Sequence, residues 1–129
     1  MDRRAQPRQR HNLRHFTNHA DIQRATVLVE DRLHPATASL PATWVASDEW
    51  YNFPSSPRGE PGVRILATID EQTYDGGTQG ADHPLAWSHD NLGGRAFYTA
   101  LGHVSSRWNE SNFVAHITGA VRWALHLAD

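Results

Sequence analysis

The sequence predicts one α/β domain, in which a sheet of four or five strands is accompanied by one long helix. The chain has 129 residues, a length that one folded core accounts for and that rules out two full domains. Short apolar runs bounded by turn residues have the character of strands. The last segment has apolar residues three and four positions apart, which is typical of an amphipathic helix.

The composition excludes several chemistries. The chain has no cysteine, which excludes disulfides, thiolate metal sites and a cysteine nucleophile. All 12 basic residues are arginine, so lysine Schiff-base chemistry and a P-loop lysine are excluded too. The net charge is -2 and no apolar run approaches the ~20 residues of a membrane helix. Neither nucleic acid nor a membrane is therefore an expected partner.

The amino terminus differs from the rest of the chain. Residues 1–14 are rich in arginine and contain none of the ~7–15-residue apolar runs that a secretory signal needs. We expect a disordered basic tail over 1–14, without an assigned function, and a folded domain over 15–129. A cytoplasmic location is the corresponding expectation.

Three strands are expected in the first half of the domain. Residues 15–25 have weak periodicity and predict at most a short turn of helix. The apolar runs 27–29 and 44–46 predict two strands, separated by a proline-marked loop over 31–42. The clearest strand is 63–69, and its lack of clean alternation indicates burial on both faces.

A loop, a hairpin and the helix follow. Residues 74–80 contain too many glycines for regular structure. Strands at 85–88 and 95–101 flank an Asn-Leu-Gly-Gly turn and should pair antiparallel. The helix has Asn109 or Ser111 available as its N-cap. Its apolar stripe consists of Phe113, Ile117, Ala120, Val121, Ala124 and Leu125.

The second face of the sheet needs cover that these elements do not supply. One helix covers one face only, whereas the strand over 63–69 indicates two buried faces. We therefore expect self-association, a partner or a further segment to cover the open face. Trp87 and Trp123 are expected to lie in the core.

Strand geometry brings distant polar residues to one edge of the sheet. In an antiparallel hairpin, the start of the first strand and the end of the second lie side by side. This places Asp82 and His83 beside His103. If 63–69 neighbours the hairpin antiparallel, Tyr74 reaches the same edge.

A fourth segment is expected to join this edge. Asp48, Glu49 and Tyr51 begin the long connection that precedes 63–69. Carboxylates and histidines together permit acid–base chemistry, and aromatic rings suit the faces of a sugar. The same residue types also permit a divalent metal, although no HxH or HExxH spacing is present.

Structural explanations compete with each of these roles. Asp48 and Glu49 are as consistent with a solvated loop pair or a helix cap as with catalysis. His83, followed by proline, favours a turn residue, and His103 is evenly balanced. Arg95 beside a diglycine turn fits either an anion clamp or a surface ion pair.

Several motifs, in this order and spacing, resemble the trehalose-utilisation (ThuA-like) family. The likeness covers about residues 16–127. The motifs are His34–Thr37, Asp48–Phe53, Tyr74–Gly77, Asp82–Trp87, Gly93–Arg95, Tyr98, Leu101–His103 and Gly119–Ala124.

The resemblance implies a three-layer fold similar to class I glutamine amidotransferases (flavodoxin-like), of which this chain covers the carboxyl-terminal half. The family's amino-terminal half, with its glycine-rich segment, has no counterpart here, so a site within this chain would be incomplete. Because the chain lacks cysteine, glutamine hydrolysis is not transferred from the fold.

The resemblance also implies a role in disaccharide metabolism, on trehalose-like or oxidised (3-keto) glycosides. The candidate catalytic or metal-binding residues are Asp48, Glu49, His83 and His103. The candidate substrate-binding residues are Tyr51, Tyr74, Asp82 and Arg95. A non-catalytic sugar-binding module and a truncated, inactive member of the family remain alternatives.

Overall fold

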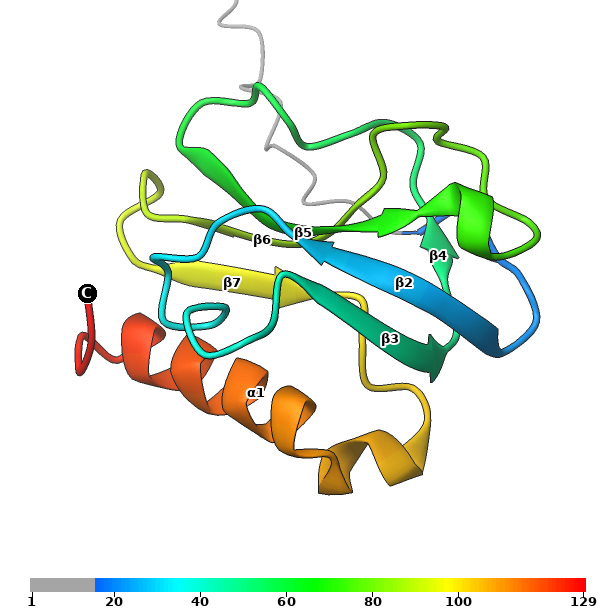
Figure 1. Ribbon diagram of the computed structural model, residues 1–129. Coiled ribbons are helices and arrows are strands. Elements are labelled where there is room, and N and C mark those ends of the chain that lie inside the picture. The colour runs from blue at the N-terminus through cyan, green and yellow to red at the C-terminus, as the bar shows by residue number, and fades with distance from the viewer. Residues whose placement is uncertain (1–15) are drawn as a thin grey trace, which may run out of the picture.

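A five-stranded sheet forms the centre of the protein. The computed structural model describes residues 16–129, and the expected basic tail lies outside them (Figure 1). The strand order is β3-β2-β5-β6-β7, and every neighbouring pair is antiparallel. The strands are β2 (Gln23–Val29), β3 (Thr43–Asp48), β5 (Val63–Asp70), β6 (Pro84–His89) and β7 (Ala96–Thr99).

Smaller elements surround this sheet. A two-stranded ribbon pairs β1 (Asn18–His19) with β4 (Tyr51–Asn52). Two 3₁₀ turns, η1 (Glu71–Thr73) and η2 (Ser105–Asn109), follow β5 and β7, and the helix α1 (Ser111–Ala124) closes the chain. None of the helices within residues 16–129 has the length and apolar character that a membrane span requires.

The five predicted strands are confirmed, and each differs from its expected bounds by a few residues. The antiparallel hairpin is confirmed by the pairing of β6 with β7. The short helical turn expected within 15–25 is wrong, because β1 is extended and pairs with β4. A partner strand more than 30 residues further along the chain determines this conformation, and local periodicity does not reveal such pairing.

The structure is a mixed sheet-and-helix domain with a curled sheet. This agrees with the expectation of one domain that combines a sheet with a helix. The three-layer, flavodoxin-like architecture is not confirmed, because the described sheet is antiparallel throughout and α1 is its one long helix within residues 16–129.

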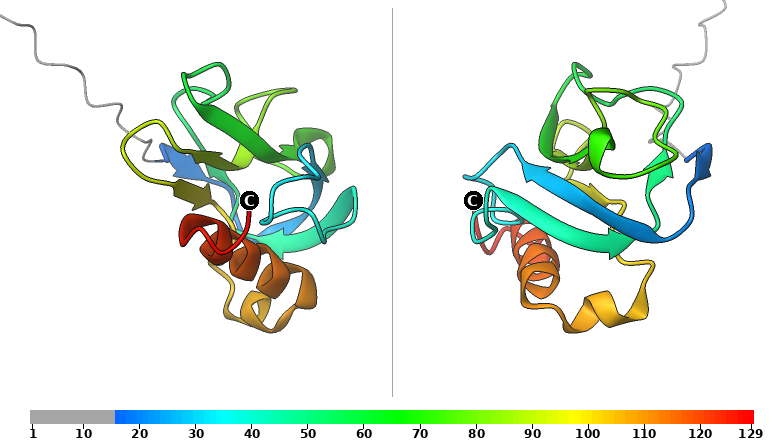
Figure 2. Two further views of the ribbon diagram at one scale, coloured as in Figure 1. Left: turned by 90° about the vertical axis from the view of Figure 1, so that its left-hand side faces the viewer. Right: turned by 45° about the vertical axis from the view of Figure 1, so that its right-hand side comes forward.

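The helix packs along one side of the sheet (Figure 2). His116 of α1 contacts Trp44 of β3 and Phe97 of β7, with ring centroids 6.3 and 5.3 Å apart. Gly119 is required at its position, because a Cβ there would overlap the carbonyl oxygen of Pro35. The loop between β2 and β3 therefore packs directly on the helix backbone.

The buried stripe of α1 differs from the predicted one. Val121 and Leu125 are exposed, whereas His116 and Trp123 are buried. The helix also begins without a side-chain N-cap hydrogen bond, since Glu110 precedes it. Trp87 and Trp123 are both buried, as predicted.

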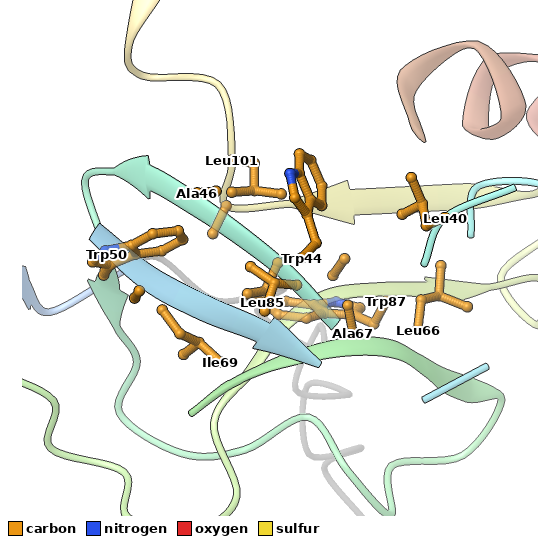
Figure 3. Packing of buried hydrophobic residues seen from close by; sticks show 14 of the residues in the cluster. Leu40, Trp44, Ala46, Trp50, Leu66, Ala67, Ile69, Leu85, Trp87 and Leu101 are labelled. Atoms are coloured by element: carbon orange, nitrogen blue, oxygen red, sulfur yellow. The ribbon is translucent and has the colours of Figure 1, made fainter. Parts of the chain in front are cut away.

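The central strands are buried on both faces, as the pattern over 63–69 predicts. All six residues of β6 are buried. Figure 3 shows two of them, Leu85 and Trp87, within the hydrophobic core. Part of the second face is covered by this chain itself: Phe53 packs edge-on against Trp87 and Tyr98. Towards β2 and β3 the cover ends, and Leu28 and Val45 are exposed.

Candidate functional site

Three segments that are far apart in the sequence meet at the end of β3. The Glu49 carboxylate lies between two imidazoles, 3.4 Å from Nε2 of His19 and 3.2 Å from Nε2 of His103. The Glu49 side chain is 13% exposed, whereas those of His19 and His103 are 43% and 46% exposed. A largely buried carboxylate thus contacts two histidines that reach solvent. We call these three residues the Glu49 cluster.

Local structure explains how each member is placed. Burial alternates along β3, so that Trp44, Ala46 and Asp48 face inwards and Glu49 follows at the strand end. His19 is held by the β1–β4 ribbon, in which it pairs with Tyr51.

His103 follows Gly102, whose φ of +114° favours glycine. A Cβ at Gly102 would also lie 3.1 Å from the Phe113 ring. The backbone at Gly102 therefore fixes the turn that presents His103.

The protonation of His19 can be assigned in part. Its Nδ1 lies 3.0 Å from the carbonyl oxygen of Ala20. Since a carbonyl only accepts hydrogen bonds, Nδ1 carries a proton, and Nε2 is the ring nitrogen that faces Glu49. An imidazole in contact with a carboxylate is a common arrangement for general acid–base catalysis.

Aromatic rings lie next to the Glu49 cluster. Phe16 stacks on Tyr51, with ring centroids 4.4 Å apart and an interplanar angle of 17°. The His19 ring is 6.2 Å from the Tyr51 ring. Phe16 remains exposed on its other side. Such a surface suits the apolar face of a sugar ring.

The nearby phenols stay protonated at neutral pH. Burial raises the pKa of Tyr51, and the negative charges of Glu49 and Asp48 raise it further. Burial also raises the pKa of Tyr98 to about 12, with a smaller contribution from Tyr51. Both hydroxyls are therefore available as hydrogen-bond donors, not as bases.

Asp48, although adjacent to Glu49, is fully buried. Its carboxylate forms an ion pair with Arg107, with Nε 3.3 Å from Oδ2. It also accepts hydrogen bonds from the backbone N–H groups of Glu49, Gly102 and Val104. Asp48, which the sequence predicts as a catalytic residue, is therefore not accessible to solvent.

His83 is buried as well. Its Nδ1 lies 2.7 Å from Oε1 of Glu71, and its Nε2 lies 2.8 Å from the carbonyl oxygen of Tyr51. The Tyr74 hydroxyl is 3.2 Å from the same Nδ1. Burial and the charge of Glu71 raise the pKa of Tyr74 well above its usual value. His83 and Tyr74 therefore lie behind Tyr51, away from solvent.

Asp82 has different hydrogen-bond partners from its sequence neighbour His83. It accepts hydrogen bonds from Ser56 and Arg58, at 2.8 and 2.9 Å. Arg58 in turn binds Glu30 at 2.7 Å. Asp82 is thus part of a surface network that contains no member of the Glu49 cluster.

Arg95 binds the end of α1. Its Nη1 donates to the carbonyl oxygens of Trp123 and Ala128, at 2.8 and 3.0 Å. The guanidinium also lies 5.1 Å from the centroid of the Trp123 ring. The structure therefore brings Glu49, Tyr51 and His103 together at the surface and does not add Arg95 or Asp82 to them.

Sequence reasoning missed two residues of this surface, His19 and Phe16. His19 and Phe16 lie in the segment of weak periodicity, which gave no signal. The pairing of Glu71 with His83 was not predicted either. Among residues 16–129, no group of three or more histidine or acidic side chains is arranged to hold a metal ion.

Known proteins provide a separate line of comparison. The family model ThuA, described as trehalose utilisation, matches residues 5–124. No curated protein matches the chain.

Two crystal structures are similar to this chain. A ThuA-like protein from Bacteroides uniformis has a TM-score of 0.74 and 27% identity, over 88% of this chain and 48% of that one. A ThuA-like protein from Parabacteroides merdae has a TM-score of 0.61 and 27% identity, over 83% of this chain and 40% of that one. The chain spans less than half the length of both.

Proposed function

The chain belongs to the ThuA (trehalose utilisation) family, and from this premise we propose that it processes a trehalose-like or oxidised (3-keto) glycoside. The observation on which the proposal depends is the Glu49 cluster. A carboxylate with little exposure contacts two half-exposed imidazoles, beside a stacked pair of aromatic rings.

The cluster suits proton transfer to or from a bound sugar. His103 is the more exposed of the two histidines and would exchange the proton, while Glu49 orients its ring. His19 supplies a second imidazole on the other carboxylate oxygen. Phe16 and Tyr51 would hold an apolar face of the sugar.

The proposal extends to the fold. We propose that the chain corresponds to the carboxyl-terminal half of a three-layer family domain similar to class I glutamine amidotransferases. The coverage of 48% and 40% of the two ThuA-like structures supports this. Further site residues would then come from the other half, and a cysteine nucleophile is excluded for this chain by its composition.

Turnover of a 3-keto-disaccharide tests the function. We expect product from the wild-type protein and a loss of about 100-fold or more in kcat for His103→Gln and Glu49→Gln, the usual size of a lost acid–base group. His126→Gln is the matched control, because His126 is exposed beyond α1. Saturable sugar binding in calorimetry, without formation of product, would indicate that the protein is a sugar-binding module and not an enzyme. No binding and no product would overturn the proposal.

A further inference from the structure

Asp48 has more hydrogen-bond donors than a simple ion pair requires. Its side chain is fully buried, and its two oxygens accept from four N–H groups. These are the backbone N–H of Glu49 at 2.9 Å, of Gly102 at 3.0 Å and of Val104 at 3.4 Å, and Nε of Arg107 at 3.3 Å.

Two of these donors flank one residue. Gly102 and Val104 stand on either side of His103, so the Asp48 carboxylate holds the peptide groups before and after it. A residue held on both sides has little freedom to move its Cα. Asp48 is also bonded directly to Glu49, the partner of His103.

We propose that Asp48 is a positioning residue, which holds His103 against Glu49 by binding the backbone on both sides of it. The inference rests on the proposed function for the chemistry of the Glu49–His103 pair. The placement itself rests on geometry: Nε2 of His103 lies 3.2 Å from the Glu49 carboxylate, although the two residues are far apart in the sequence.

Arg107 is the fourth donor to Asp48, and we call these four hydrogen bonds the Asp48 clamp. Besides Asp48, it binds the carbonyl oxygen of Ser47 and the carboxylate of Glu110, and it lies over the Trp44 ring at 5.9 Å. The Arg107 guanidinium thus places its positive charge against the buried Asp48 carboxylate. Hydrogen bonds that involve such charged groups are stronger than those between neutral groups.

Nuclear magnetic resonance of the His103 imidazole tests this role without any substrate. In Asp48→Asn, the amide NH₂ faces a backbone N–H or Arg107, so one side of the clamp opens. We expect the His103 ring signals to move to the positions that they have in Glu49→Gln. Asp82→Asn is the matched control, since it changes a carboxylate outside the cluster and should leave these signals unmoved. Unmoved His103 signals in a folded Asp48→Asn protein would reduce Asp48 to a purely structural residue.

Val104→Pro provides a second variant, which keeps the Asp48–Arg107 pair. Val104 has a φ of −78°, which proline adopts, and the change removes the N–H that binds Asp48 while it keeps a small apolar side chain. We expect the His103 signals to move in the same direction as in Asp48→Asn. If neither variant folds, amide exchange in the wild-type protein decides: slow exchange at Gly102 and Val104 is expected, and exchange as fast as in an unfolded chain would overturn the clamp.

Turnover separates this inference from the proposed function. If the protein is an enzyme, Asp48→Asn should lower kcat by about 100-fold, as misplacement of a catalytic group by about 1 Å does. Adding Glu49→Gln should then cause no further loss, because both changes remove the same pair. A wild-type protein without turnover would defeat the proposed function, and the resonance experiment would still decide the role of Asp48.

Discussion

Within residues 16–129, histidines contact a glutamate at two places, Glu71 and Glu49, which differ in their surroundings. His83 and Glu71 are 2.7 Å apart, and their side chains are 1% and 15% exposed. His103 and Glu49 are 3.2 Å apart, and His103 is 46% exposed. The same two residue types therefore occur once in the interior and once at the surface.

The difference lies in what remains for a ligand to bind. Both ring nitrogens of His83 have partners within the chain, at Glu71 and at the Tyr51 carbonyl. Glu71 also binds the backbone N–H groups of Gln79 and Gly80, which orders the glycine-rich loop. A pair whose polar atoms are all used by the chain acts as scaffold, whereas the surface pair can exchange protons with a ligand.

Removal of the buried pair should have the largest effect on stability. His83→Leu removes the imidazole donor to the Tyr51 carbonyl and one of the donors to the Glu71 carboxylate, which should lower the free energy of unfolding by about 3 kcal/mol. His103→Leu is the matched control and should change it by about 0.5 kcal/mol or less, because surface substitutions cost little. Urea unfolding of both variants measures the contrast. Equal losses would contradict the division into scaffold and site.

A buried histidine without a carboxylate partner should make the fold sensitive to acid. Burial, with the charge of Arg64 as the next cause, lowers the pKa of His34 from 6.5 to about 4. In this pH range the unfolded chain binds the proton more tightly, so stability is fully present above about pH 6.5 and is lost as pH falls towards 4.

The expected loss for His34 is about 2–3 kcal/mol between about pH 7.5 and about pH 4.5. Urea unfolding at the two pH values measures it. His34→Gln is the variant that isolates the effect, because it removes the titrating group. The variant should lose less stability than the wild-type protein over the same range. An identical loss in both proteins would assign the acid sensitivity to other groups.

The sequence contained more of the fold than of the site. Apolar runs located all five strands, since burial on a sheet leaves a local pattern. Antiparallel pairing then placed His83 and His103 at one edge. What each residue at that edge can do depends on where its side chain points. The alternation of a strand predicts part of this: because Trp44 and Ala46 face inwards, Asp48 faces inwards as well.

Other residues had no such signal. His19 belongs to a two-residue strand that exists because β4 pairs with it, so its position depends on the whole fold. The same holds for Arg95, whose partners lie about 30 residues further along the chain at the end of α1. Interactions of this range follow from tertiary packing, which neither spacing nor composition specifies.

The smallest effect is expected at Asp82, the sequence neighbour of His83. Its ion pair with Arg58 is 41% and 44% exposed, so Asp82→Asn should lower the free energy of unfolding by at most about 1 kcal/mol. That loss should shrink between ionic strengths of about 0.1 M and about 1 M, because salt screens exposed charges. Urea unfolding at both ionic strengths measures it. A loss as large as that of His83→Leu would mean that Asp82 and His83 support the fold as one network. The contrast between a surface residue and its buried sequence neighbour, which Glu49 and Asp48 show, would then not hold for Asp82 and His83.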